Sequence, residues 1–187
     1  MASTADFRNG FTFTENGELF QIIEFQHVKP GKGGAFVRTK LRNVKTKAVI
    51  DRTYRAGEKV DEVRLERKPY EYLYHDGSFY VFMDTQTYDQ IQLDEGIFGE
   101  EVRFLIENTE CGILFHGDTP IEVEIPAHMN LEVIETEPGI RGNTATNVLK
   151  PAKLSGGAEI TVPLFIEVGN IVRIDTRTGT YIERVNK

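Results

Sequence analysis

Short strand-like runs, separated by turn signals at intervals of roughly 8–12 residues, repeat along most of the chain. Two such runs flank Asn16-Gly17 and two aromatic-rich runs flank Asp76-Gly77, dipeptides that two-residue hairpin turns favour. Arg177-Thr178-Gly179 predicts a further hairpin near the end of the chain. Many short strands joined by turns are typical of small β-barrels and sandwiches, so we predict an all-β protein.

Other strand-like runs are less clearly bounded. We expect strands within 121–125, 131–136, 159–163, 170–175 and 180–185, and at one of two alternatives, 101–104 or 112–115. One segment, 98–108, has helical spacing instead. Its apolar residues Val102, Leu105 and Ile106 would share one face behind an acidic start, which predicts a short helix.

Changes in composition divide the 187 residues into three segments, 1–65, 66–127 and 128–187. Each has about 60 residues, near the lower limit for a self-sufficient hydrophobic core. A strand-like run that ends in proline occurs at 121–126 and again at 158–163. This weak repeat suggests that the second and third segments are related domains.

The residue content also limits where the chain acts. Cys111 is the only cysteine, so no intramolecular disulfide can form, and its apolar neighbours predict a buried strand position. No apolar run reaches the 18 or more residues of a membrane span, and the first residues lack the apolar core of a signal peptide. We therefore expect a cytoplasmic, monomeric protein without a membrane partner.

Positive charge is concentrated near the N-terminus, although the net charge of the chain is −7. Between Val28 and Lys47 there are seven basic residues and no acidic one. Such asymmetry suggests a local contact with a polyanion on an otherwise acidic protein. A solvated basic face explains the charge equally well, and charge alone does not decide between the two.

We find no catalytic constellation in the sequence. The four histidines, His27, His75, His116 and His128, lack the spacing of metal ligands. The glycine-rich stretch 29–34 is not a Walker loop, because Lys32 is followed by Gly33 where a Ser or Thr is needed. We therefore predict a protein that is not an enzyme and has no metal site or cofactor.

The stretch 29–34 is predicted to be the tip of a long hairpin between strands at 18–28 and 35–44. Its glycines permit unusual backbone conformations, Pro30 stiffens the entry, and Lys32 would project furthest. An ordinary solvated turn is the simpler reading. The basic residues that continue along the second strand favour a contact with a phosphate backbone.

The chain resembles the bacterial elongation factor P family over nearly its whole length, a family related to the hypusine-containing factor of eukaryotes and archaea. The resemblance rests on Asp-Phe-Arg-Asn-Gly at 6–10, on 28–43 and on 72–84. In the third segment the matching positions are Lys150, Ala152, Gly157, Ile160, Val162, Pro163, Ile166 and Gly169. The resemblance implies three small barrels in an L shape, an SH3-like (KOW-type) domain followed by two OB-fold domains.

The resemblance also implies a function. The protein would bind the 70S ribosome between the P and E sites, contact the P-site peptidyl-tRNA, and stimulate peptide-bond formation at consecutive prolines. Lys32 would reach the acceptor end of the tRNA and would be the target of a modifying enzyme. The implied supporting residues are Lys29, Pro30, Gly31, Gly33 and Gly34 in the loop, Arg38, Lys40 and Arg42 at the RNA backbone, and Gly142, Asn143, Thr144, Ala145, Tyr181 and Arg184 in the third domain.

Two alternatives stay open. One is an elongation factor P-like paralogue with a different cellular task, and the other is a free-standing OB-fold RNA-binding protein. The second expects aromatic residues interleaved with basic ones. The aromatic residues of the second segment lie among acidic and neutral neighbours instead, which argues against it.

Overall fold

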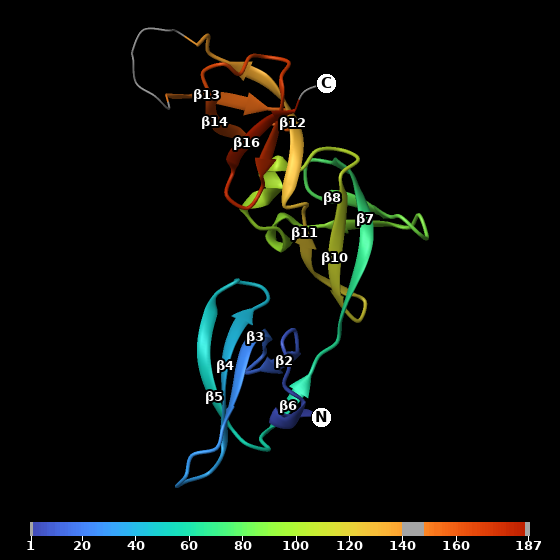
Figure 1. The fold of residues 1–187 in the computed structure, drawn as a ribbon. Helices are drawn as coiled ribbons and strands as arrows, with labels where there is room; N and C mark the ends of the chain where they lie inside the picture. The colour runs from blue at the N-terminus through green and yellow to red at the C-terminus, as the bar shows by residue number, and fades with distance from the viewer. Residues whose placement is uncertain (1, 140–147, 186–187) are drawn as a thin grey trace. The chain divides into compact units, whose positions relative to one another are not determined.

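The computed structural model describes residues 2–139 and 148–185, which form three antiparallel sheets and three short 3-10 helices (Figure 1). This confirms the predicted all-β class. None of the described helices has the length and apolar character needed to cross a bilayer.

The first sheet has six strands in the order β1-β6-β2-β3-β4-β5. Its strands are β1 (Ala2–Ser3), β2 (Thr12–Glu15), β3 (Glu18–Val28), β4 (Phe36–Asn43), β5 (Val49–Arg55) and β6 (Lys59–Glu62), and the helix η1 (Thr4–Asp6) follows β1. Asn16 and Gly17 join β2 to β3 with φ of 54° and 82°, the positive values that a type I′ hairpin turn requires. The predicted hairpin is therefore confirmed.

An aromatic cluster fills the core of this first sheet. Phe7, Phe13 and Tyr54 pack in edge and stacked arrangements with ring centroids 5.6–6.0 Å apart. All three side chains are buried, together with Phe20 and Ile22 from β3. The core anchors the base of β3 and β4, so the far ends of these two long strands can extend as a rigid arm.

The second sheet has the order β11-β10-β7-β8-β9. Its strands are β7 (Leu65–His75), β8 (Tyr80–Asp84), β9 (Gln90–Leu93), β10 (Glu110–His116) and β11 (Thr119–Glu124). The turn between β7 and β8 contains Gly77 with φ of 101°, as the Asp76-Gly77 signal predicts. Of the two alternative strands, 112–115 lies within β10, whereas 101–104 is helical.

The third sheet has the order β14-β13-β12-β15-β16. Its strands are β12 (His128–Thr136), β13 (Leu149–Leu154), β14 (Glu159–Pro163), β15 (Ile171–Asp175) and β16 (Thr180–Val185). Gly179, with φ of 68°, closes the predicted hairpin between β15 and β16. The strands expected in this part of the sequence are all present.

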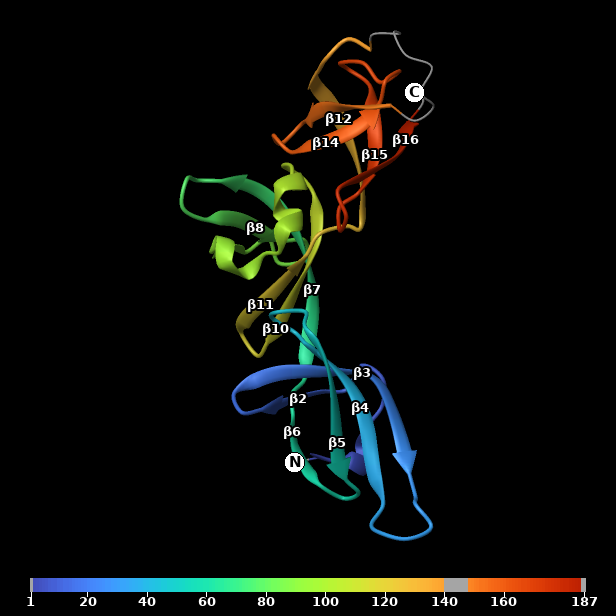
Figure 2. The ribbon, with the colours of Figure 1, turned by 90° about the vertical axis from the view of Figure 1, so that its left-hand side faces the viewer.

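The helix predicted over 98–108 is shorter and tighter than expected. The segment contains the 3-10 helix η3 (Glu100–Phe104), and a second one, η2 (Glu95–Ile97), precedes it (Figure 2). Phe104 is the fully buried residue of this segment, and it belongs to the core cluster of the third sheet. A run of five residues is too short for the α-helical stripe that the spacing suggested.

By its internal contacts the chain divides into two compact units. One comprises Met1–Arg67 and Leu114–Glu122, and the other comprises Lys68–Ile113 and Val123–Lys187. The two domain boundaries suggested by composition stay a prediction.

Candidate nucleic-acid interface

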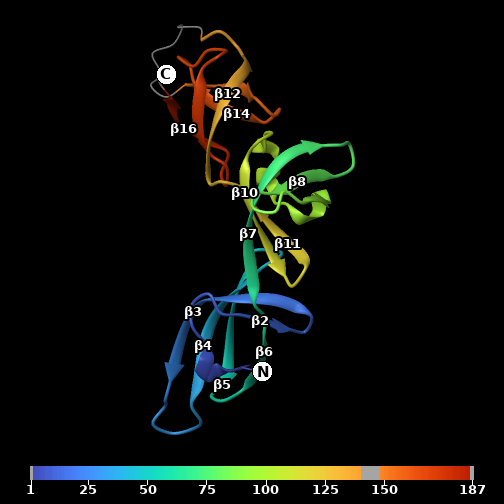
Figure 3. The same ribbon diagram turned by 90° about the vertical axis from the view of Figure 1, so that its right-hand side faces the viewer.

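The hairpin of β3 and β4 carries the predicted contact loop. The two strands pair from Phe20↔Asn43 to Val28↔Phe36, and residues 29–35 join them at the far end. In all three views this loop projects beyond the neighbouring strands of the first sheet (Figure 1, Figure 2 and Figure 3). Residues 29–34 are all exposed, which is the placement that the sequence predicted for the loop.

The three glycines of the loop differ in what their backbone requires. Gly33 has φ of 106°, a conformation that side chains disfavour. Gly31 and Gly34 do not have positive φ, and an added Cβ would meet no atom within 4 Å at either position. The fold of the isolated chain therefore requires glycine at Gly33 and tolerates a side chain at the other two.

The Lys32 side chain is free among the residues that the structure describes. It is exposed and makes no hydrogen bond or ion pair there. Lys29 and Pro30, on the entry side of the loop, are exposed as well. An unpaired ammonium group at the end of a projecting hairpin can approach an anionic partner without breaking an existing contact.

The predicted backbone contacts lie on one face of β4. Successive side chains of a strand point to opposite sides, so Arg38, Lys40 and Arg42 share the outer face while Val37 and Leu41 enter the core. The register places Arg38 opposite Gln26 of β3 and Thr53 of β5. The structure thus brings the three basic residues of β4 together on one solvent-facing surface.

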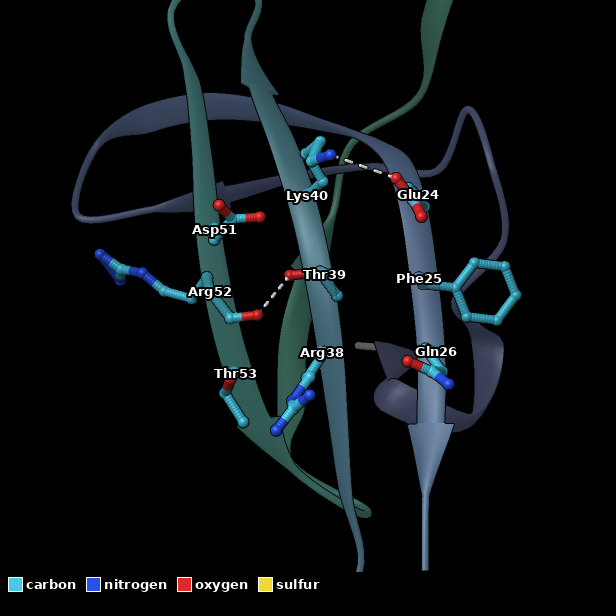
Figure 4. A pocket seen from close by; sticks show the side chains of 9 residues that line it. All are labelled: Glu24, Phe25, Gln26, Arg38, Thr39, Lys40, Asp51, Arg52 and Thr53. Atoms are coloured by element: carbon cyan, nitrogen blue, oxygen red, sulfur yellow. Dashed lines mark hydrogen bonds and ion pairs between the residues drawn. The ribbon is translucent and has the colours of Figure 1, made fainter.

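A shallow cavity of about 370 Å³ lies on this outer face of the sheet (Figure 4). Its lining comes from three adjacent strands and comprises Glu24, Phe25, Gln26, Arg38, Thr39, Lys40, Asp51, Arg52 and Thr53. Figure 4 shows Arg38 directed toward Thr53, and Asp51 directed toward Lys40. The side chains of Phe25 and Arg52 point away from the middle of the cavity.

The two basic residues of the cavity have different surroundings. Lys40 Nζ lies 3.3 Å from Glu24 Oε2, an exposed ion pair of the kind that contributes about 0–1 kcal/mol. The Arg38 guanidinium carbon lies 5.5 Å from the ring centre of Phe36, and no carboxylate among the described residues pairs with it. Arg38 therefore keeps its charge and all its hydrogen-bond donors available.

The candidate residues of the third sheet are only partly described. Residues 142–145 lie outside the described part of the chain, so the predicted contact by Gly142, Asn143, Thr144 and Ala145 has no structural account. Arg184 of β16 is exposed, and its guanidinium carbon lies 5.7 Å from the ring centre of Phe165. Tyr181 packs against the third core, and burial raises the pKa of its hydroxyl. Tyr181 thus has a packing role whether or not it also contacts RNA.

Among the described residues no three His, Cys, Asp or Glu side chains form a group that could hold a metal ion. Cys111 is 5% exposed in β10, and burial raises the pKa of its thiol to about 12. This confirms the expected buried strand residue, which is unreactive because its thiolate form is suppressed.

The sequence did not indicate the residues that β3 and β5 contribute to the outer face. Gln26, Asp51 and Thr53 stand beside the basic residues only because of strand register. The only usable signal was the polar side of the long strand at 18–28, which shares a hairpin with β4. No comparable signal marked β5, whose single buried residue is Tyr54.

Models of known protein families match three successive parts of the chain. A model described as the elongation factor P KOW-like domain matches residues 3–60, the elongation factor P OB domain matches 65–123, and the elongation factor P C-terminal model matches 129–184. The predicted architecture, a KOW-type domain followed by two OB-like domains, is confirmed.

Similar whole proteins are found among bacteria. The elongation factor P of Leifsonia xyli subsp. xyli is 52% identical over 186 residues, covering 100% of both chains. That of Pelotomaculum thermopropionicum is 52% identical over 185 residues, covering 99% of this chain and 100% of the relative. A solved structure of a translation initiation factor eIF-5A family protein from Naegleria fowleri has a TM-score of 0.52 at 13% identity. It covers 66% of this chain and 96% of its own, and it shows a shared fold.

Proposed function

Since this chain belongs to the elongation factor P family, we propose that it enters the ribosome between the P and E sites and stimulates peptide-bond formation at consecutive prolines. It is a translation factor and not an enzyme, it acts in the cytoplasm, and it associates with the ribosome. A KOW-like domain accompanies the OB domain, so the chain is not a free-standing OB-fold module.

One observation carries the proposal: Lys32, exposed and unpaired among the residues described, stands at the end of a hairpin that projects from a well-packed sheet. Prolyl-tRNA reacts slowly because its secondary amine and ring restrict the approach to the attack geometry. A cation held at the acceptor end of the P-site tRNA would limit the motion of that end. The rate gain is then an effect of orientation, and no side chain of the factor takes part in acid–base chemistry.

The remaining basic residues hold the RNA without reading its sequence. Arg38, Lys40 and Arg42 contact backbone phosphates from the outer face of β4, and Lys29 adds charge at the entry to the loop. Arg184, Tyr181 and residues 142–145 would contact RNA from the third domain. Pro30 and the loop glycines keep the tip narrow enough to enter a crowded site.

Lys32 is also the proposed site of covalent modification. Its exposed ammonium group is accessible to a modifying enzyme, and an extension there would lengthen the reach of the tip. The intact mass of the natively expressed protein tests this, because an added group on Lys32 increases the mass by a fixed amount that is absent from a Lys32→Ala variant.

Lys32→Ala tests the function itself. We expect the variant to lose nearly all stimulation of peptide-bond formation on a consecutive-proline template in a reconstituted translation system. The loss follows from removing the charge at the acceptor end. The substitution should leave the melting temperature unchanged, because Lys32 has no hydrogen-bond or ion-pair partner among the described residues.

Lys45→Ala is the matched control, since Lys45 is another exposed lysine and lies in the turn between β4 and β5, away from the tip. It should retain the stimulation of the unchanged chain. Full stimulation by Lys32→Ala would contradict the proposed function.

A further inference from the structure

The cavity on the outer face of β3, β4 and β5 contains two cross-strand rows with different chemistry. Arg38 lies between Gln26 and Thr53, so the first row offers hydrogen-bond donors and one positive charge. The second row, Glu24, Lys40 and Asp51, holds two carboxylates around one ammonium group. The two rows together form a site with an anion-binding side and an acceptor side.

One group in each row is uncommitted. Lys40 is paired with Glu24, whereas neither Arg38 nor Asp51 has an ion pair or side-chain hydrogen bond among the described residues. Arg52 also borders the cavity, but its side chain points away from the middle of it. Its guanidinium donates a hydrogen bond of 2.5 Å to Glu15 Oε2. Within the described part of the chain, the cavity therefore presents one unpaired cation and one unpaired carboxylate.

Arg38 and Asp51 are diagonal neighbours on adjacent strands, because Arg38 is opposite Thr53 and Asp51 is opposite Lys40. Diagonal positions are about 7–8 Å apart, within reach of long side chains. A ligand that contacts both side chains must carry a negative charge for Arg38 and a hydroxyl or amino donor for Asp51. The two groups must lie close together in the ligand. A second negative charge beside Asp51 would be repelled.

We propose that this cavity is a ribonucleotide-backbone subsite in which Arg38 binds one phosphodiester and Asp51 accepts a hydrogen bond from the adjacent ribose 2′-hydroxyl. A single RNA residue supplies both groups, whereas DNA lacks the hydroxyl and leaves the carboxylate unmatched beside a phosphate. The subsite thus selects RNA over DNA without reading base sequence. This inference rests on the proposed function, in which the same face of β4 follows an RNA backbone.

The Phe36 ring is a positioning element for this subsite. It lies 5.5 Å from the Arg38 guanidinium carbon and opposite Val28, at the end of the strands nearest the loop. A cation–π contact of this kind restricts the long arginine side chain without using its hydrogen-bond donors. Arg38 is therefore held over the sheet with its donors free for phosphate.

The test measures binding of the full chain to an acceptor-stem hairpin RNA by fluorescence anisotropy at several salt concentrations. A series of probes replaces one ribose at a time by 2′-deoxyribose, and an all-DNA hairpin completes the series. For the unchanged chain, we expect one deoxy position to weaken binding about tenfold, the loss typical of a hydrogen bond to a charged group.

Asp51→Ala, which removes both acceptor oxygens, should bind the all-ribose probe about tenfold more weakly and should lose its sensitivity at that same deoxy position. Arg38→Gln should weaken binding to RNA and DNA alike and lower the salt slope by about one, as expected for one lost phosphate contact. Asp61→Ala is the control, because Asp61 is an exposed carboxylate on β6 outside the cavity, and it should behave as the unchanged chain.

The inference is overturned if Asp51→Ala keeps the full sensitivity at that position, if no single deoxy substitution weakens binding, or if RNA and DNA hairpins bind equally. These outcomes are separate from those of the proline-template assay. If the Asp51→Ala variant loses the 2′-hydroxyl sensitivity and the Lys32→Ala variant stays active in translation, the proposed function is rejected and the subsite is kept. If the Asp51→Ala variant keeps the sensitivity and the Lys32→Ala variant is inactive in translation, the subsite is rejected and the proposed function is kept.

Discussion

Gly31 and Gly34 occupy positions that the isolated fold leaves free for a side chain, whereas Gly33 needs its positive φ. Glycine in an exposed loop increases the entropy lost on ordering, so two glycines without a conformational role are unfavourable for the isolated chain. They are explained if another surface approaches the backbone closely at the loop. The open space beside Gly31 and Gly34 is where the proposed tRNA end would lie.

Alanine substitutions separate these roles. Gly34→Ala should leave the free energy of unfolding unchanged or raise it by about 0.4–1 kcal/mol, so the melting temperature should stay the same or rise slightly. It should nevertheless lower the stimulation of proline-template translation, because a methyl group enters the space reserved for the partner. Thermal unfolding and the reconstituted translation assay measure the two effects on the same preparation.

Gly10→Ala serves as a comparison in the turn before β2, where φ of 85° makes an alanine strained although its Cβ would meet no atom within 4 Å. It should be less stable than the unchanged chain and yet active when folded. Equal activity of Gly34→Ala and the unchanged chain would mean that the loop backbone makes no close contact.

At the scale of elements, the hairpins were predictable because their signals are local. Asn16-Gly17 specifies its own turn, and the alternation in β2 and β3 agrees with it. The strand β5 gave no such signal, since Tyr54 is its only buried residue and charged residues occupy both faces of this edge strand. Register with β4, a non-local property, then decides that Asp51 stands beside Lys40.

The candidate site was predictable to the same extent. Arg38, Lys40 and Arg42 follow from alternation within one strand, and the exposure of Lys32 follows from the turn. The free carboxylate of Asp51 and the ion pair of Lys40 depend on neighbours distant in sequence. Sequence reasoning therefore found the positive half of the surface and not its acidic half.

The segment of η3 illustrates the same limit and leads to a prediction. Its spacing suggested an amphipathic helix with Val102, Leu105 and Ile106 inward. Leu105 is buried and Ile106 packs against the third core, but Phe104, which the spacing did not indicate, is the fully buried residue that enters it. Ile106 and Phe104 also lie against turn glycines of the third sheet. An added Cβ would approach Ile106 Cγ2 to 2.9 Å at Gly156, and Phe104 Cζ to 3.3 Å at Gly179.

Phe104→Ala should therefore destabilise the third sheet, although Phe104 lies outside its strands. Removing a fully buried phenyl ring costs about 3–5 kcal/mol, which is a large part of the stability of a small domain. Hydrogen exchange should show lost protection in β12 and β15, and urea unfolding should show a lower midpoint.

The matched change is Phe165→Ala. Phe165 belongs to the same unit as Phe104, but it is 59% exposed. Its effect should stay within about 0.5 kcal/mol. Similar midpoints for the two variants would show that η3 does not support the third sheet.

At the scale of the whole molecule, the N-terminal part is positively charged although the net charge of the chain is negative. Residues 1–65 carry 12 basic and 8 acidic side chains, whereas residues 66–187 carry 10 and 21. A positive surface on an acidic protein attracts RNA at one place and repels it elsewhere. Acidity also improves solubility, so the two explanations differ only in their effect on RNA binding.

Neutralising carboxylates outside the first sheet distinguishes these explanations. Glu110, Glu132 and Glu159 are exposed strand residues, and their combined change to Gln alters the net charge from −7 to −4. If the acidic domains repel unrelated RNA, the triple variant should bind an unstructured polyuridylate about threefold more tightly at low salt, and the difference should vanish at high salt. The corresponding triple change to Asp preserves the charge and should bind as the unchanged chain does. Equal binding of all three proteins at low salt would leave solubility as the role of the acidic residues, and RNA selection would then depend on the surface of β3, β4 and β5 alone.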